Sequence, residues 1–255
     1  MRDFKFASKQ SDIKPIMMVY GSPGVGKTTM AKSIPNKVFF DLNHGTSGYD
    51  MDSDIIDIGN PSPEDLYNTI VEALFFIYDS LPDKKWIVID TVHELEKAIM
   101  DRVIKENPTL KTSKGLDWGA YSLASDKRYK IFNMLERLRK DKDIGTVFIA
   151  HRDIKKIDVR DGDSYNYVTP DLSNSIMSFY GQRLDHIIYV EKSIIVDVKN
   201  NTSKLSGRFA FYEESGLFLA KSRIPSEKKL PINGKTEFTW SKIIETISPE
   251  RKGNT

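Results

Sequence analysis

The chain has 255 residues, of which 39% are hydrophobic and 29% charged, as expected for a globular protein that buries a substantial core. No apolar run approaches the ~20 residues of a membrane helix, and the N-terminal residues lack the apolar core of a secretory signal. The sequence has no cysteine, which excludes disulfides and cysteine-ligated metals. Its four histidines are isolated and show no metal-ligand spacing. The formal net charge is only +2, so the overall charge does not indicate a nucleic-acid partner. We expect a cytoplasmic protein without membrane attachment, whose partners are identified by local motifs.

The first 150 residues alternate apolar runs with helical patterns, which predicts a mostly parallel sheet flanked by helices. Strands are expected at residues 16–20, 37–41, 86–90 and 146–150. Ser62 followed by Pro63 is typical of a helix start. Helices are expected at residues 28–34, 63–80, 92–105 and 120–140, with a polar loop at 111–118.

Beyond residue 151 the pattern changes to short alternating segments separated by polar turns, which is typical of antiparallel β-hairpins. These segments are 155–159, 165–168, 187–190, 194–198 and 208–212, and a final helix is expected at 239–247. The simplest organisation is a short N-terminal arm at residues 1–14, one α/β domain at 15–247 and a loose tail at 248–255. The hairpin-rich part of the domain covers residues 151–235.

Residues Gly21 to Thr28 read Gly-Ser-Pro-Gly-Val-Gly-Lys-Thr, the complete G-x-x-x-x-G-K-[ST] pattern of a phosphate-binding loop. The loop lies between a predicted strand and a predicted helix, which is the context that the motif requires. Its glycines let backbone N–H groups surround phosphate oxygens, its lysine supplies a positive charge, and its threonine hydroxyl can bind Mg²⁺. The sequence therefore predicts a nucleoside triphosphate site with ATP and Mg²⁺ as cofactors, formed by Gly21, Ser22, Pro23, Gly24, Val25, Gly26, Lys27, Thr28 and Thr29.

Asp90 ends an apolar strand about sixty residues after the loop, a position from which an acid can hold Mg²⁺ through water. Together with Thr28 it forms the expected metal site, and an aspartate that only caps the next helix is the alternative. The following residue is Thr91, where the AAA+ class usually carries a glutamate. The Asp-Thr pair instead resembles the RecA-core ATPases.

In RecA-core ATPases the acid that orients the attacking water ends the second strand, and a polar sensor of the γ-phosphate ends the fourth. The resemblance makes His151 this sensor, with an ordinary strand-end histidine as the alternative. At the end of the second strand, Asp41-Leu42-Asn43 places an asparagine where the family carries glutamate. An amide can orient water but cannot accept its proton. Either Asp41 or another acid accepts the proton, or hydrolysis is slow and ATP serves mainly as a conformational ligand. We expect weak hydrolysis.

Three further segments extend the resemblance to small phage-encoded RecA-core ATPases of single-strand annealing and recombination: Asp117-Trp118-Gly119, Thr169-Pro170-Asp171-Leu172 and Ala220-Lys221-Ser222-Arg223. The resemblance covers about residues 14–247, and only the phosphate loop within it is highly specific. It implies single-stranded DNA as a partner, cooperation with a single-strand-binding protein, and assembly into a homo-oligomeric ring or filament.

Assembly places each nucleotide site beside a neighbouring protomer in such proteins, and the resemblance assigns Lys221 and Arg223 as cations that reach the neighbour's γ-phosphate. Solvated strand-end charges are the alternative. Phe4-Lys5-Phe6-Ala7 matches an F-x-x-A docking pattern, which chance can also produce. A DNA-binding loop is expected after the sensor, formed by Arg152, Lys155, Lys156, Arg160, Tyr165 and Tyr167. Four aspartates balance the four cations of this segment, so a solvated hairpin is the alternative there.

These features predict an ATP-binding, weakly hydrolysing P-loop ATPase that binds single-stranded DNA in phage recombination. The alternative is a nucleotide-dependent loader or assembly ATPase that acts on replication proteins. A small-molecule phosphotransferase is disfavoured because no arginine-rich lid follows the loop, and a GTPase because no N-K-x-D-like motif is present.

Overall fold

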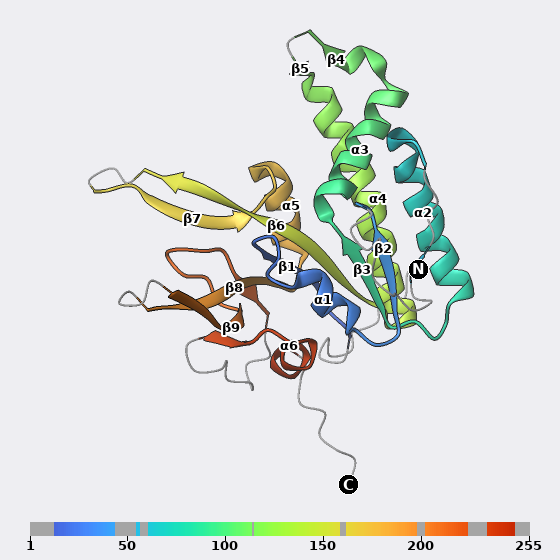
Figure 1. Ribbon diagram of the computed structural model, residues 1–255. Helices are drawn as coiled ribbons and strands as arrows, with labels where there is room; N and C mark the ends of the chain where they lie inside the picture. Colours follow the sequence, from blue (N-terminus) through green and yellow to red (C-terminus); the bar gives the residue numbers. More distant parts are fainter. Residues whose placement is uncertain are drawn as a thin grey trace, which may run out of the picture.

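The computed structural model describes residues 13–43, 55–56, 61–113, 115–158, 162–197, 202–223 and 234–247, which form an α/β fold (Figure 1). Its centre is a nine-stranded sheet with the strand order β11-β9-β8-β1-β6-β3-β2, in which β10 also pairs with β8 and β7 with β6. The five parallel strands are β2 (Lys37–Asp41), β3 (Trp86–Asp90), β6 (Gly145–Ile157), β1 (Ile16–Gly21) and β8 (His186–Asp197). The prediction of a mostly parallel, helix-flanked sheet with later antiparallel strands is confirmed.

The parallel strands are apolar on both faces because helices cover both sides of the sheet. In β1, Ile16, Met18 and Tyr20 pack into one core, while Met17 and Val19 pack into the other. The first core is covered by α2 (Pro63–Ser80), α3 (Val92–Glu106), α4 (Trp118–Lys142) and α5 (Asn174–Arg183), and the second by α1 (Lys27–Lys32) and α6 (Trp240–Ile247). The sheet is therefore a buried middle layer that fixes the loops at its edges.

The carboxyl ends of the parallel strands meet at one edge of the sheet, where open α/β sheets bind their ligands. The register places Gly21 beside His151 of β6 and beside Val190 of β8. Asp90 pairs with Asp41 of β2 on one side and with Ile149 of β6 on the other. The ends of β2 and β3, together with His151 of β6 and Val190 of β8, therefore lie at the same level of the sheet as the end of β1, where the loop begins.

Strand β6 is longer than the sequence predicts. Residues up to His151 pair in parallel with β1, and the rest of the strand pairs with antiparallel β7 (Tyr165–Pro170). The two strands form a ribbon that projects from the sheet (Figure 1). The segment predicted at 146–150 and residues 155–157 of the segment predicted at 155–159 thus belong to one strand, because the polar residues between them alternate along an exposed ribbon instead of forming a turn.

Strand β8 also continues beyond the parallel part of the sheet. It pairs with β1 up to Val190, and along its length with antiparallel β9 (Thr202–Phe211), with a register shift between Ser193 and Ile194. The segment predicted at 187–190 and residues 194–197 of the segment predicted at 194–198 are therefore parts of one strand. Two short strands complete this side of the sheet, β10 (Lys221–Ser222) on β8 and β11 (Lys235–Glu237) on β9.

Two details differ from the sequence prediction. Helix α5 was not predicted; it begins after Ser173, whose hydroxyl accepts a hydrogen bond from the N–H of Ile176. The segment at 111–118 is not a plain loop, because after the 3₁₀ turn η2 (Pro108–Leu110) it contains a small ribbon of β4 (Lys111–Thr112) and β5 (Gly115–Leu116). The arm at residues 1–12, with its F-x-x-A match, and the tail at 248–255 lie outside the described residues.

A buried ion pair connects three helices of the first core. Arg128 of α4 donates to both carboxylate oxygens of Glu96 in α3 at 2.6 to 2.9 Å, and the Tyr180 hydroxyl of α5 donates to the same carboxylate at 2.8 Å. Glu96 and Arg128 are each 8% exposed. The pair therefore fixes α3, which follows Asp90, against α4 and α5. Within the described part of the chain, no helix is long and apolar enough to cross a membrane.

Candidate nucleotide-binding site

The phosphate loop connects β1 to α1 with a backbone that requires glycine at particular positions. Gly24 and Gly26 have φ angles of +70° and +101°, which side chains with a Cβ atom rarely adopt. Gly21 has a different constraint, because a Cβ atom there would collide with the carbonyl oxygen of Val190 in β8. The loop thus packs directly against β8, and Gly24 and Gly26 contribute no side chains of their own where a phosphate cradle needs access to N–H groups.

Lys27 lies at the start of α1 and folds back over the loop. Its Nζ donates to the carbonyl oxygens of Gly21 at 2.9 Å and Ser22 at 3.0 Å. Burial lowers the pKa of this ammonium group to about 8, and the nearby carboxylate of Asp90 partly opposes the shift. An ammonium group that is partly desolvated and held by carbonyl oxygens is well placed to receive an anion.

Thr28 and Asp90, the two expected metal ligands, are in direct contact. The Thr28 hydroxyl donates to Oδ2 of Asp90 at 2.8 Å. Burial raises the pKa of Asp90, an effect that the Thr28 hydrogen bond opposes and that the neighbouring Asp41 carboxylate reinforces. One hydroxyl and one carboxylate side by side suit Mg²⁺, which binds proteins through one or two carboxylates and takes its other ligands from phosphates and water. Across the described residues, no group of three or more acidic, histidine or cysteine side chains forms a self-sufficient metal site.

The two residues expected to act on water are placed differently from each other. Asp41 is buried at the end of β2, directly opposite Asp90 in the strand register. Asn43 lies two residues farther on, exposed in a turn. The sheet therefore places Asp41 beside Asp90 at two buried strand ends, whereas Asn43 lies outside this buried pair.

His151 lies beside Gly21 in the neighbouring strand and is partly buried. Burial lowers the pKa of its imidazole, and the positive charge of Lys27 lowers it further. Its Nδ1 atom is buried, and no hydrogen-bond partner for it exists among the described residues. A neutral imidazole with an unsatisfied buried nitrogen, close to the lysine of a phosphate loop, is suited to contact a phosphate oxygen.

Lys221 and Arg223 do not lie at the phosphate loop of their own chain. Their strand β10 pairs with His186 and Ile187, whereas Val190 lies at the other end of the stretch of β8 that pairs with β1. Lys221 donates to the carbonyl oxygens of Gly181 and Leu184, and Arg223 donates to that of Gln182. Both cations thus bind carbonyl groups at the C-terminal end of α5, as cations at helix ends commonly do. Their action on a neighbouring protomer stays a prediction.

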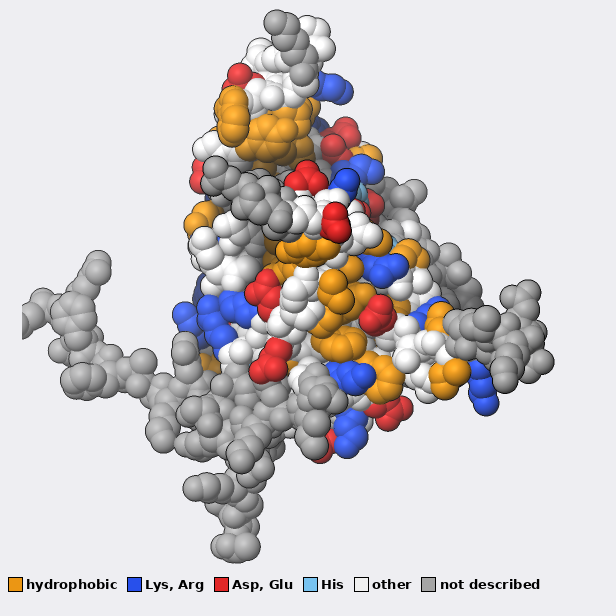
Figure 2. Space-filling model, turned by 90° about the vertical axis from the view of Figure 1, so that its left-hand side faces the viewer, with side chains coloured by type: hydrophobic (Ala, Val, Ile, Leu, Met, Phe, Trp, Pro, Cys, Tyr) orange, Lys and Arg blue, Asp and Glu red, His pale blue; other side chains and the backbone are white. Residues whose placement is uncertain are grey.

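The residues expected to bind DNA lie on the β6–β7 ribbon, apart from Arg160, which lies outside the described residues. Several of their polar groups are already engaged, since Lys155 donates to Asn174 at 2.7 Å and Tyr167 donates to Glu214 at 2.5 Å. Figure 2 shows the side of the molecule from which the ribbon projects, where blue and red side chains are mixed with orange patches. The described residues on this side therefore give no continuous basic surface that would identify the partner by charge alone.

Two cations that were not singled out in the sequence lie next to the phosphate loop. Lys192 of β8 and Arg208 of β9 approach Gly24 and Gly26, respectively, to within 4 Å of the positions that Cβ atoms would occupy. No local signal in the sequence marks them, because their position depends on the pairing of β8 with β1 and β9.

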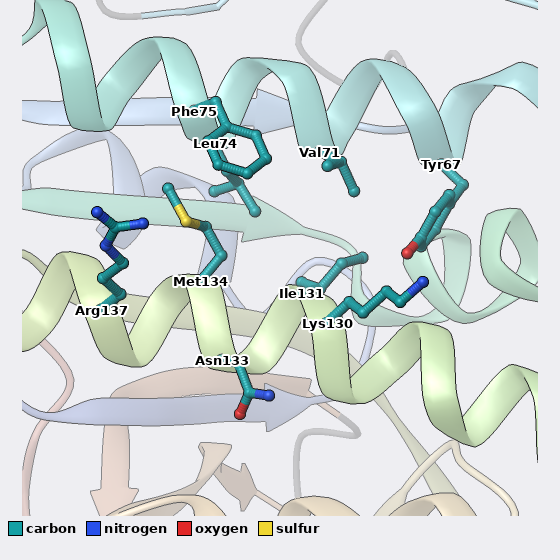
Figure 3. A pocket seen from close by; sticks show the side chains of 9 residues that line it. All are labelled: Tyr67, Val71, Leu74, Phe75, Lys130, Ile131, Asn133, Met134 and Arg137. Atoms are coloured by element: carbon teal, nitrogen blue, oxygen red, sulfur yellow. The ribbon is translucent and has the colours of Figure 1, made fainter.

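A pocket of about 380 Å³ lies between α2 and α4, away from these residues. Figure 3 shows that its lining comes from the two helices, with apolar side chains such as Leu74, Ile131 and Met134 together with Lys130 and Arg137. None of its lining residues belongs to the phosphate site.

The sheet topology and the glycine loop define the class of P-loop nucleotide-binding proteins. Comparison with protein families matches residues 13–224 to the AAA domain family, and the chain belongs to this family of P-loop ATPases. A search of curated proteins finds no matching sequence. Among solved structures, the crystal structure of the RadB recombinase is similar, with 13% sequence identity, coverage of 78% of this chain and 81% of that chain, and a TM-score of 0.40.

The family carries the AAA name, yet Thr91 follows Asp90, so the glutamate expected there in the AAA+ class is missing. The assignment of a water-orienting group to the end of β2, as in RecA-core ATPases, stays a prediction.

Proposed function

We propose that this P-loop ATPase binds single-stranded DNA under the control of ATP and Mg²⁺ and acts in phage recombination by single-strand annealing. The observation that carries the proposal is the course of β6. The strand brings His151 beside Gly21 of the phosphate loop and then continues, without a break, into the projecting ribbon with β7. The course of β6 supports the proposal because it joins the proposed sensor, His151, and the proposed DNA-binding segment in one strand.

The residues of the site fit the proposed cofactors. The loop from Gly21 to Gly26 and Lys27 would hold the phosphates, and Thr28 and Asp90 would hold the metal, partly through water. When bound, Mg²⁺ supplies neutralisation of the charge that develops on the phosphates. His151 remains neutral near pH 7, since burial and Lys27 lower its pKa, so its free nitrogen can report on the terminal phosphate by a hydrogen bond.

Hydrolysis is proposed to be slow. Asn43 takes the position of the expected glutamate, and its amide can orient water but cannot accept a proton. Asp41 is the candidate carboxylate for accepting this proton, but it is buried beside Asp90. ATP therefore acts mainly as a conformational ligand, and its hydrolysis resets the DNA-binding ribbon.

The DNA-binding residues are proposed to be Arg152, Lys155, Lys156, Arg160, Tyr165 and Tyr167, with the tyrosines as stacking surfaces. The active form is a homo-oligomeric ring or filament that cooperates with a single-strand-binding protein. In it, Lys221 and Arg223 would exchange the α5 carbonyl groups for a neighbour's γ-phosphate.

Binding of a fluorescent single-stranded oligonucleotide tests the proposal. Affinity should rise when ATP and Mg²⁺ are added and should fall as salt is raised. Lys27→Ala should abolish the effect of ATP, whereas Lys97→Ala, which removes an exposed lysine on α3, should not. Equal DNA binding with and without ATP, or none at all, would instead favour a loader that acts on replication proteins.

A further inference from the structure

The β8–β9 ribbon passes over the phosphate loop of its own chain. Val190 of β8 pairs with Gly21, and Lys192 follows two residues later on the same face of the strand. Arg208 of β9 lies directly opposite Lys192 in the antiparallel register. The pairing of two strands thus sets two cations side by side at the mouth of the phosphate loop.

These cations lie over the two loop positions with a left-handed backbone. A Cβ atom on Gly24 would be 3.8 Å from Nζ of Lys192, and one on Gly26 would be 3.7 Å from Nη1 of Arg208. The same glycines keep the loop main chain open to an anion. A ligand held by the loop would therefore lie within reach of both side chains.

The placement of the two cations is unfavourable without an anion. Like charges directly opposite each other on adjacent strands repel. Within the described part of the chain, neither Lys192 nor Arg208 has an acidic partner or a side-chain hydrogen bond. Glu191, the neighbouring acid, has its side chain on the other face of β8, because side chains alternate along a strand. Among the residues that the structure describes, the two positive charges therefore have no counter-charge, and a polyphosphate would supply one.

We propose that Lys192 and Arg208 form a clamp, supplied by the chain itself, that holds the phosphate tail from the β8–β9 side and favours a triphosphate over a diphosphate. The clamp rests on the proposed nucleotide site and adds to it the residues that select the number of phosphates. Arg208 offers a planar fork of donors for phosphate oxygens, and Lys192 offers a mobile point charge. Because both residues belong to the same chain as the loop, tight binding of ATP does not require a neighbouring protomer.

The test compares Lys192→Gln and Arg208→Gln with the wild type and with Lys204→Gln, which removes an exposed cation farther along β9. Calorimetry should show that the affinity for ATP is about tenfold or more lower in each clamp variant and that the affinity for ADP is lowered less. The affinities of Lys204→Gln for both nucleotides should equal those of the wild type. Without nucleotide, the Tm of each clamp variant should rise by about 1–3 °C, because the repulsion is relieved. The Kd of the wild-type protein for ATP should not depend on protein concentration, because the clamp and the loop belong to the same chain.

Two results separate failure of the clamp from failure of the nucleotide site. ATP binding that is lost in Lys27→Ala but stays within twofold of wild type in both clamp variants would overturn the clamp alone. Absence of ATP binding by the wild-type protein would overturn the clamp and the proposed function together. An equal loss of ATP and ADP affinity in the clamp variants would overturn their role in selecting the triphosphate.

Discussion

Raising the pH should weaken nucleotide binding, because the ammonium group of Lys27 titrates close to neutrality. The side chain is buried among carbonyl oxygens of the loop, and this desolvation lowers its pKa to about 8, although Asp90 nearby favours the charged form. A polyphosphate on the loop would favour the ammonium form and raise the pKa again. Binding above pH 8 must therefore include the uptake of a proton.

The size of the effect follows from the fraction of protein that carries the charge. With a pKa of about 8, roughly nine-tenths of Lys27 is protonated at pH 7 and roughly one-tenth at pH 9. If only the ammonium form binds well, ATP affinity should fall about tenfold between these two pH values. His151 does not contribute there, since its lowered pKa keeps it neutral throughout this range.

Calorimetry at pH 7, 8 and 9 in buffers of different ionisation enthalpy measures both the Kd and the protons taken up. Lys27→Arg keeps the charge at all three pH values, so its affinity, though weaker, should not depend on pH in this range. Lys32→Arg serves as the matched control on α1, because burial lowers the pKa of Lys32 as well, and it should behave like the wild type. Wild-type binding that shows no proton uptake at pH 9 would refute the reasoning.

Two further substitutions test the core and the chemistry of the site. Glu96→Gln should lower the free energy of unfolding by about 3–5 kcal/mol, because Arg128 would stay buried without its counter-charge. Urea unfolding measures this loss, and Arg137→Ala is the control because the ion pair of Arg137 with Asp141 is exposed. An equal loss of stability in the control would contradict the role of burial. Asn43→Glu should raise the rate of ATP hydrolysis about tenfold or more, because a carboxylate can accept the proton of the attacking water. Single-turnover assays measure this rate. An unchanged rate would mean that another acid, such as Asp41, already orients the water.

The phosphate loop and the central strands could be predicted from the sequence because their signals are local. Eight consecutive residues carry the loop motif, and the strands that end in Gly21, Asp41 and Asp90 are continuous apolar runs, as strands buried on both faces must be. Their convergence follows from parallel pairing, since the ends of neighbouring parallel strands meet at one edge. Sequence reasoning therefore placed Lys27, Thr28 and Asp90 in the same region.

The rest could not be predicted, because it depends on pairing between distant segments. Past His151, polar residues in β6 look like a break in the sequence, but they continue as a strand once β7 is available to pair with them. Helix α5 has a short and weakly amphipathic pattern that is interrupted by Gly181, so periodicity alone does not identify it. Lys192 and Arg208 look like ordinary strand charges until β8 is paired with β1.

The two strands that flank β1 explain why one small site could govern a much larger surface. β6 and β8 both pair with β1, and both continue beyond the phosphate loop as ribbons, one with β7 and the other with β9 (Figure 1). His151 lies at the base of the first ribbon, and Lys192 and Arg208 lie at the base of the second. A phosphate tail contacted from both sides would fix the two ribbons relative to each other, and its loss would leave the cations repelling and His151 unsatisfied. Nucleotide binding would thus act on the whole projecting surface through differential contacts at its base.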